Sequence, residues 1–463
     1  MSDRGLEQDS SGAETPEAPE QLLVRAQADA RAGRFDLARA ACVAVLSQQP
    51  GHAAATGLLG MIAGKTGQLD DARGLLEQAV GAAPRMAALH SALASVYQKL
   101  CRPSEALREA MAAVTMQPNN AEFLVGLAMI QTDLDQHEQA KISLLRAIGH
   151  NPDASEAHLA LAQVLLAQGE MAPGWLEYEW RNRMDVAHNA LPRMTSPAWN
   201  GMRIPGGRLL LIGDQGYGDT IQFARYIPMV AERCREIVLG CSSELVPLLK
   251  DIPGITQCLS RWDAIPPHAA HMRLSGLPLI FGTTPDTIPA KAPYLAADPE
   301  RMRVWSTRLG LRSNPRVGIA WRGRPTHPND IRRSVALTQL TPLTTVRPME
   351  FVCLQKAPPA SDQPAFASFS GMIDQSDYLQ DFSDTAALIA SLDLVICVDS
   401  AVAHLAGALG RPCWVLLAKA ADWRWMLGRE DSPWYPSLRL FRQHTPGDWS
   451  DVIEAVKIAL EEI

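Results

Sequence analysis

A hydrophobic position recurs every 34 residues along the first third of the chain. Leu59, Leu93, Leu127 and Leu161 each precede a small residue. The same step links Ala26, Gly60, Ala94, Ala128 and Ala162; Ala38, Ala72, Ala106 and Ala140; and Pro50, Pro84, Pro118 and Pro152. Small residues allow two helices to approach closely, and a proline prevents a helix from continuing. The pattern therefore predicts successive helix pairs stacked into an all-α solenoid.

The 34-residue step is that of the tetratricopeptide repeat, a pair of antiparallel helices. Four repeats are clear between Pro19 and Asp153, and a fifth begins near Ser155. The fifth has Gly174 at the usual alanine and Arg181 at another small position, as in atypical end repeats that cap a solenoid. We place the solenoid at residues 19–181. Its repeats either hold a scaffold or dimer together, or bind a protein acceptor on their concave face.

The hydrophobic pattern changes after Trp180. Residues 182–206 contain three prolines and a glycine (Pro192, Pro197, Gly201 and Pro205) with no sustained period, which predicts a linker. Short apolar runs then alternate with helical segments, and this alternation predicts parallel sheets with right-handed crossovers. The expected strands are 208–212, 236–239, 316–321, 351–354, 394–397 and 413–417, and the expected helices are 220–232, 243–250, 384–392, 402–409 and 449–462.

Two separate strand–helix starts favour two Rossmann-like α/β lobes, at residues 207–312 and 313–463. A ligand of such lobes lies in the crevice at the carboxyl ends of the strands. A single large sheet is the alternative.

Composition and charge narrow the choice of partners. The net charge is -7, and no run of Lys and Arg could follow a nucleic acid backbone. Residues 1–18 are acidic and rich in Ser, Gly, Pro and Glu, so we expect them to be disordered and not a signal peptide. No apolar run approaches the roughly 18 residues that span a bilayer. The eight cysteines are scattered singly, which predicts reduced core residues in a cytoplasmic protein.

The loop Gly213–Asp219 is the first candidate for chemistry. Its three glycines lie between a strand and a helix, where a backbone can approach an anionic ligand closely. Asp219 has two interpretations. Its carboxylate either removes a proton from an attacking hydroxyl or simply caps the following helix.

The segment 398–405 is the second candidate. A strand ends at Asp399, Ser400 makes a turn, and a helix opens, so free N–H groups and the helix dipole would favour a pyrophosphate. His404 lies one turn into that helix. It either donates to the same phosphate or packs within the core.

A third region is polar and basic. It joins Trp321 and Arg322 to His327, Asn329 and Arg333, with Gln355 and Lys356 after a later strand. Lys356 would balance the charge of a departing diphosphate, or it would simply be solvated. The aromatic segments 422–425 and 432–435 either stack on a base or sugar or pack the last helix against the sheet.

Other chemistries fit poorly. The chain has no G-x-S-x-G nucleophile elbow and no H-E-x-x-H zinc helix. No acidic cluster is spaced as a divalent-metal site.

Taken together, several strings resemble those of bacterial tetratricopeptide-repeat proteins whose glycosyltransferase domain is related to the lipopolysaccharide heptosyltransferases. The strings are 169–180, 214–226, 317–321, 333–334, 354–356, 399–407 and 422–443. The layout is also similar to that of the O-GlcNAc transferases, and to repeat-fused enzymes that glycosylate flagellin. The resemblance implies a GT-B fold, inversion at the anomeric carbon, and no required metal or other cofactor.

The resemblance also implies roles for particular residues. Asp219 occupies the place of the family's proposed base, and Asp399, Ser400, Ala401 and His404 correspond to its phosphate loop. Ala401 replaces a glycine of the family pattern. The donor-binding residues expected from the three regions are Gly216, Tyr217, Gly218, Gln222, Trp321, Asn329, Arg333, Lys356, Asp399, Ser400, Ala401 and His404.

We therefore expect an inverting glycosyltransferase that moves a sugar from a nucleotide sugar to a protein hydroxyl, such as a flagellin Ser or Thr, chosen by the repeats. The alternative is a non-enzymatic assembly or chaperone protein with a degenerate transferase domain. Neither a nucleic acid nor a membrane is an expected partner. The donor nucleotide, the sugar, the acceptor and any homo-oligomer stay open.

Overall fold

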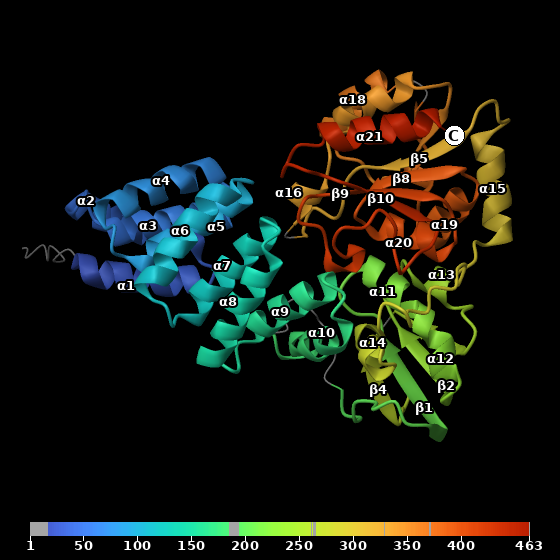
Figure 1. Ribbon diagram of the computed structural model, residues 1–463, viewed down its shortest axis with the longest axis horizontal. Coiled ribbons are helices and arrows are strands. Elements are labelled where there is room, and N and C mark those ends of the chain that lie inside the picture. Colours follow the sequence, from blue (N-terminus) through green and yellow to red (C-terminus); the bar gives the residue numbers. More distant parts are fainter. Residues whose placement is uncertain are drawn as a thin grey trace, which may run out of the picture. The chain divides into compact units, whose positions relative to one another are not determined.

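The computed structural model describes residues 17–184, 194–260, 262, 265–327, 329–369 and 372–462. Most of the expected disordered segment 1–18, and residues 185–193 of the expected linker, lie outside these ranges. The chain divides into two compact units, Met1–Ile130 and Gln131–Ile463, which are treated separately below. Figure 1 labels their elements.

Helical pairs with the predicted period fill the first part of the chain. They are α1 (Pro19–Arg31) and α2 (Phe35–Gln48), α3 (Ala53–Lys65) and α4 (Leu69–Ala82), α5 (Ala87–Lys99) and α6 (Pro103–Met116), α7 (Ala121–Asp133) and α8 (His137–His150), and α9 (Ser155–Ala167) and α10 (Met171–Tyr178). A single residue separates each periodic proline from the end of the second helix of its pair. The prediction of an α-helical repeat solenoid is confirmed.

Small residues explain how the paired helices pack. The periodic Ala38, Ala72, Ala106 and Ala140 are fully buried. A Cβ added to Gly60 would lie 2.7 Å from the Cγ of Leu76, so a larger residue at this position would force α3 and α4 apart.

The turn inside each pair has a left-handed residue at the same period. These residues are Gly33, Gly67, Cys101, Asp135 and Gly169, with φ between 56° and 85°. Glycine adopts this conformation without steric strain, whereas Cys and Asp do so at a cost.

The carboxylate of Asp135 is engaged in an ion pair. Asp135 pairs with Lys419, and the neighbouring Asp133 lies 2.8 Å from the guanidinium of Arg332. Both basic residues come from the C-terminal part of the chain. The turn after α7 is therefore fixed to loops far along the sequence, within the second unit.

The fifth helical pair does more than cap the repeats. The Nε1–H group of Trp175 in α10 donates to the carbonyl of Thr283 at 2.9 Å, and Trp175 packs edge-on against Trp423 and Trp434. One continuous hydrophobic core includes α9, α10 and both α/β lobes. The hydrophobic core therefore continues across residue 181, where the repeat solenoid was expected to end.

A short turn of 3-10 helix, η1 (Glu179–Arg183), follows α10. His158 of α9 stacks on Trp180 with ring centroids 3.7 Å apart. The same histidine lies 2.5 Å from Glu177 and 2.9 Å from the carbonyl of Pro152, so it joins both helices of its pair to the preceding turn.

The first lobe contains a four-stranded parallel sheet with the order β3-β2-β1-β4. Its strands are β1 (Ile204–Ile212), β2 (Cys234–Gly240), β3 (Ile255–Leu259) and β4 (Ala270–Arg273). The helices are α11 (Tyr217–Phe223), α12 (Ile227–Ala231), α13 (Val246–Leu249) and α14 (Leu277–Ile280), with a 3-10 turn at 224–226 between α11 and α12. The predicted linker therefore ends inside β1.

The second lobe contains a six-stranded parallel sheet with the order β10-β9-β8-β5-β6-β7. Its strands are β5 (Arg316–Ala320), β6 (Glu350–Cys353), β7 (Met372–Ile373), β8 (Leu394–Val398), β9 (Cys413–Leu417) and β10 (Leu438–Arg442). The helices are α15 (Pro299–Leu309), α16 (Asp330–Arg333), α17 (Leu337–Leu340), α18 (Gln363–Ser368), α19 (Phe382–Ala390), α20 (Ala401–Ala408) and α21 (Ser450–Glu461).

Two faces of the six-stranded sheet are covered by different helices. Residues such as Val317 and Ile396 share a core with α17 and α21, and alternate residues such as Val395 and Cys397 share the larger core with α19 and α20. Figure 1 shows α18 and α21 on one side of this sheet and α19 and α20 on the other. Two separate parallel sheets, each with helices, confirm the α/β part of a GT-B-like unit and overturn the single-sheet alternative.

Several predicted boundaries differ from the observed ones. The helix expected at 220–232 starts at Tyr217 and is interrupted, because Pro228 begins a new helical turn after the 3-10 segment. The expected lobe boundary at 312 comes too late. The backbone N–H of Tyr294 donates to Ala408, and Arg301 of α15 pairs with Asp381, so residues from 294 onward already pack on the second lobe.

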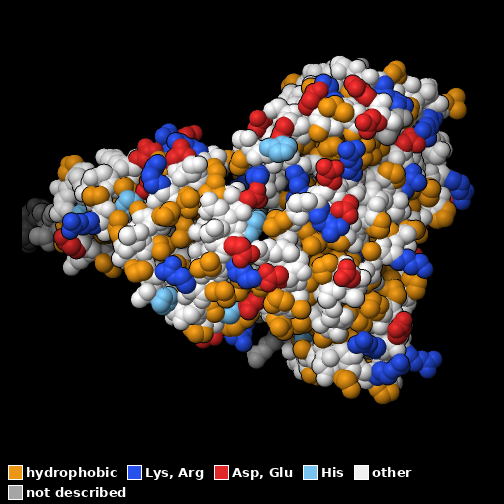
Figure 2. Space-filling view, in the orientation of Figure 1, with side chains coloured by type: hydrophobic (Ala, Val, Ile, Leu, Met, Phe, Trp, Pro, Cys, Tyr) orange, Lys and Arg blue, Asp and Glu red, His pale blue; other side chains and the backbone are white. Residues whose placement is uncertain are grey.

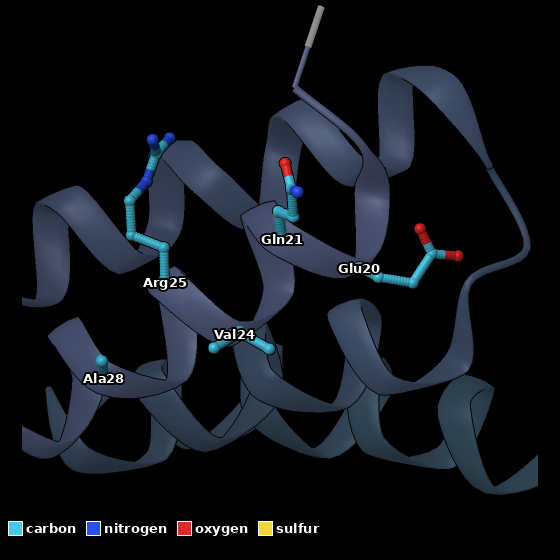
Figure 3. Close-up of a pocket in the computed structure, with 5 residues that line it drawn as sticks. All are labelled: Glu20, Gln21, Val24, Arg25 and Ala28. Atoms are coloured by element: carbon cyan, nitrogen blue, oxygen red, sulfur yellow. The ribbon is translucent and has the colours of Figure 1, made fainter.

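Charged side chains of both signs lie on the visible face of the molecule. Figure 2 shows Lys and Arg side chains interspersed with Asp and Glu on the visible face. One shallow hollow of about 400 Å³ lies along α1, lined by Glu20, Gln21, Val24, Arg25 and Ala28 (Figure 3). Among the helices that the structure describes, none combines the length and the apolar character required to cross a bilayer.

Candidate functional site between the two lobes

Two helix starts face each other between the lobes. α11 follows β1, and α20 follows β8, so both begin at the carboxyl ends of parallel strands. A Cβ added to Gly218 would lie 2.6 Å from Cδ2 of His404 and 3.5 Å from Cα of Ala401. The absence of a side chain at Gly218 therefore allows the first turn of α11 to approach the first turn of α20.

Ser400 is the residue at the start of α20. It has an extended backbone, with φ of -155° and ψ of 174°, and the next residue begins the helix. Its hydroxyl oxygen is buried and has no hydrogen-bond partner among the described residues. A buried hydroxyl without a partner, next to the free N–H groups of a helix start, is suited to bind an anionic oxygen.

Asp219 lies in the first turn of α11. One carboxylate oxygen accepts the backbone N–H of Gly216 at 2.9 Å, and the other accepts from the guanidinium of Arg424. Asp219 therefore caps α11, as one of its two interpretations states. Burial raises the pKa of this carboxyl group, although Arg424 acts to lower it. A raised pKa makes a carboxylate a better proton acceptor, so capping leaves the role of base open.

Arg424 connects the two lobes. It lies in the 3-10 turn η9 (Trp423–Trp425) of the second lobe, with only 8% of its side chain exposed. Its Nε–H donates to Oε1 of Gln222 at 2.7 Å, and its Nη1 lies 2.8 Å from Asp422. Together with the contact to Asp219, these bonds leave one guanidinium shared by two carboxylates and one amide.

His404 is buried beneath this group. Its Nδ1 lies 2.9 Å from the hydroxyl of Tyr435, and its ring stacks on Trp425 with centroids 5.3 Å apart. Burial, with smaller contributions from the nearby Arg424, Arg225 and Arg333 and against the influence of Asp422, lowers the pKa of His404 to about 3. The imidazole is therefore neutral at physiological pH.

Asp399 lies at the end of β8, directly before Ser400. Burial and, to a smaller extent, the carboxylate of Asp422 raise its pKa to about 6, against the opposing influence of Arg333 and Arg424. Arg333 comes from α16, where it lies 3.4 Å from Asp330. The three sequence segments around Asp219, Asp399 and Arg333 are thus brought to one place.

Other predicted donor-binding residues are placed less favourably. Trp321 is fully buried, and its Nε1–H donates to Asp362 at 2.7 Å, so its indole presents no surface to a ligand. Asn329 is exposed and forms the start of α16. Gln222 is completely buried and reaches the site through Arg424.

Lys356 and Tyr217 form a separate group. The ammonium of Lys356 donates to the carbonyl of Gln380 at 2.7 Å. The ring of Tyr217 lies 4.9 Å from that of Phe382. The pKa of Glu244 is lowered by its own backbone N–H and, to a smaller extent, by Tyr217 and Lys356. These contacts connect the lobes at a second place.

Sequence reasoning assigned no role to Arg424 or Arg225, and it placed Tyr435 only in an aromatic segment that either stacks on a ligand or packs the last helix. The aromatic residues around them are buried, with Trp425 and Tyr435 completely inaccessible, which supports packing over stacking on a ligand. The guanidinium of Arg225 donates to the carbonyl of Trp434 at 2.7 Å across the lobes. In the sequence, Arg225 and Arg424 were marked only by belonging to the strings that carry the family resemblance.

Comparison with known proteins agrees with this architecture. Residues 29–96 and 132–172 match models of the tetratricopeptide repeat, and residues 380–447 match glycosyltransferase family 9 (heptosyltransferase). The last segment contains Ser400, His404, Arg424 and Tyr435, whereas Asp219 lies outside it.

A curated relative spans both parts. "Protein FlbA" of Caulobacter vibrioides is 28% identical over 423 residues, which cover 84% of this chain and 69% of FlbA. Among solved structures, the tetratricopeptide-repeat protein TTC0263 of Thermus thermophilus is 21% identical, with a TM-score of 0.34, over 37% of this chain and 93% of its own. YrrB, described as "a TPR protein with an unusual peptide-binding site", is 16% identical, with a TM-score of 0.31, over 38% of this chain and 95% of its own.

The two structural likenesses are partial and have no bearing on activity. The family matches and the relative confirm the resemblance that the sequence strings indicated. The chain thus combines tetratricopeptide repeats with a heptosyltransferase-type region, which is the composition of a repeat-fused glycosyltransferase.

Proposed function

We propose that the second unit transfers a sugar from a nucleotide-diphosphate sugar to a hydroxyl of a protein, with inversion and without a metal. The observation that carries this proposal is the start of α20. There the buried Ser400 hydroxyl lacks a partner, and three guanidinium groups, those of Arg225, Arg333 and Arg424, act on the neighbouring His404. Free N–H groups at a helix start, a hydroxyl without a partner and nearby guanidinium groups can together stabilise the charge of a leaving diphosphate, even though Arg424 is also paired with Asp219 and Asp422.

The reaction is a single displacement. The acceptor oxygen attacks the anomeric carbon as the bond from that carbon to the phosphate oxygen breaks. Asp219 accepts the proton of the acceptor hydroxyl, and the N–H groups at the start of α20, with Ser400 and His404, donate to the departing phosphate. Asp219 is suited to this role because it stands opposite α20 and because burial raises its pKa.

The repeats supply the protein acceptor in this proposal. Tetratricopeptide repeats stack into extended concave surfaces, and the core that α9 and α10 share with the lobes joins this last helical pair directly to the transferase. A flagellin Ser or Thr as acceptor, a cytoplasmic location and independence of metal stay predictions from the sequence.

The competing function is a non-enzymatic assembly protein with a degenerate transferase domain. Its support is Ala401, which replaces a glycine of the family's phosphate loop. Gly218 on the facing helix has no side chain, however, and so lets α11 approach Ala401 closely. The buried hydroxyl of the neighbouring Ser400, which has no hydrogen-bond partner among the described residues, argues against degeneracy.

Nucleotide binding separates the two functions. The purified chain is heated with UDP, ADP, GDP or CMP, and the unfolding temperature is compared with that of the free protein. A nucleotide at about one hundred times its Kd stabilises the folded state by about 2.7 kcal/mol. We expect one nucleotide to raise the unfolding temperature clearly. If all four leave it unchanged, the non-enzymatic function is favoured.

Replacing Gly218 with alanine is expected to weaken nucleotide binding by about tenfold or more, because the new methyl group would displace the imidazole of His404. Isothermal titration with the nucleotide identified above measures the change. Gly149→Ala is the matched control, since a Cβ at that exposed position of α8 meets no atom within 4 Å. Equal affinities for both variants would contradict the proposal that the nucleotide binds beside Gly218 and His404.

A further inference from the structure

One ring nitrogen of His404 is hydrogen-bonded to a second titratable side chain, that of Tyr435. Its Nδ1 lies 2.9 Å from the hydroxyl of Tyr435, and both side chains are almost entirely buried. A neutral imidazole has one N–H group and one lone pair, so the direction of this hydrogen bond decides which nitrogen carries the proton.

The surroundings of Tyr435 favour one direction. The guanidinium carbon of Arg225 lies 4.5 Å from the centre of the Tyr435 ring, so a permanent cation faces this phenol. A guanidinium group has only donors, so it attracts the lone pairs of the Tyr435 oxygen and repels the hydroxyl proton. The hydroxyl proton of Tyr435 is then free to point at Nδ1 of His404.

Tyr294 is the competing neighbour of the Tyr435 hydroxyl. Its own proton goes to the carbonyl of Ile221 at 2.9 Å, and its oxygen already faces the guanidinium of Arg225 at 3.4 Å. Tyr294 is therefore a poorer acceptor for the Tyr435 proton than the free lone pair of His404.

The opposite edge of the imidazole faces the gap between the lobes. Cδ2 and Nε2 of His404 lie 2.6 Å and 3.4 Å from the position of a Cβ on Gly218. If Nδ1 accepts from Tyr435, Nε2 carries the proton and presents a donor at the start of α20. If Nδ1 donates, Nε2 presents a lone pair, which would repel a phosphate oxygen.

We propose that Tyr435 is a positioning residue that fixes the proton of His404 on Nε2, so that the imidazole donates to the leaving phosphate. This inference rests on the proposed function. Arg225 belongs to the first lobe, whereas Tyr435 and His404 belong to the second. The donor character of His404 therefore depends on the packing of the two lobes against each other.

The first test is independent of activity. Nitrogen-15 NMR of the histidine side chains in the free wild-type protein reports the tautomer, and His404→Gln identifies the resonances of His404. We expect the Nε2-protonated form in the wild type and a mixture of tautomers in Tyr435→Phe, which keeps the buried ring. Tyr294→Phe is the matched control, because it leaves the Tyr435 hydroxyl in place, and its tautomer should stay that of the wild type.

The second test measures transfer. Tyr435→Phe should lower kcat by about tenfold to a hundredfold, the effect of one hydrogen bond to a charged group, with a smaller change in KM for the nucleotide sugar. In a His404→Gln background, whose amide N–H group replaces Nε2–H, Tyr435→Phe should have no further effect on kcat.

Two results would overturn the inference: an Nδ1-protonated His404 in the wild type, or undiminished kcat in Tyr435→Phe. A wild-type protein that neither binds nor turns over nucleotide sugars would instead overturn the proposed function. The NMR experiment would still decide the tautomer in that case. If Tyr435→Phe does not fold, the wild-type tautomer alone decides the question.

Discussion

Replacing Asp219 with asparagine should lower kcat for sugar transfer by about a hundredfold to ten-thousandfold, because an amide cannot accept the proton of the acceptor hydroxyl. Nucleotide affinity should change little, since the proposed phosphate contacts come from α20. Initial rates and nucleotide titration on the same preparation measure both quantities. The rate of the wild-type enzyme should also fall as the pH drops through the pKa of Asp219, which burial raises above its ordinary value.

Asp422→Asn is the control for this experiment. Asp219 and Asp422 both bind the guanidinium of Arg424, so each substitution removes one negative charge from the same cation. Only Asp219 is expected to act as a base. If the two variants lose the same fraction of kcat, the loss reflects disruption of the ion-pair group, and proton removal by Asp219 is wrong.

Replacing Arg424 with methionine should lower the free energy of unfolding by about 3–5 kcal/mol, as expected when one partner of a buried ion pair is removed. The substitution leaves Asp219 and Asp422 without their cation and removes the donor to Oε1 of Gln222. Urea denaturation followed by tryptophan fluorescence is suitable, because Trp423 and Trp425 flank the site.

Arg429→Met is the matched control for Arg424→Met. Arg429 also pairs with an aspartate two residues away, Asp431, but that carboxylate is 70% exposed. A surface pair contributes about 1 kcal/mol or less, so Arg429→Met should change the unfolding free energy little. The double variant Arg424→Met/Asp422→Asn should recover part of the loss, because it removes one of the two uncompensated charges. Equal losses in Arg424→Met and Arg429→Met would contradict the burial argument.

The sequence predicted the repeats well because their signal is local and recurs at a fixed spacing. It predicted the core strands for a similar reason, since buried parallel strands are short continuous apolar runs. The start of α11 was placed too late. Its glycines read as a loop, whereas Gly216 and Tyr217 already begin the helix with help from the Asp219 carboxylate.

Only part of the candidate site could be predicted from the sequence. Each helix start could be found because a strand, a turn and a helix are consecutive in the chain. The role of Arg424 could not be predicted, because no local sequence pattern indicates that its guanidinium will pair with the carboxylate of Asp219, 205 positions earlier. Trp321 was expected to bind the donor because it joins a polar, basic loop after a strand. Its hydrogen bond to Asp362, which could not be predicted, depends on a segment 41 residues later.

The ion pairs of Asp133 and Asp135 have a consequence for engineering the repeat array. Because these carboxylates bind Arg332 and Lys419, and because Trp175 is embedded in the transferase core, α8 to α10 are held in a fixed register. A 34-residue unit inserted downstream of Asp135 would separate these contacts from one another, so any redesign of the repeats should leave residues 133–178 intact.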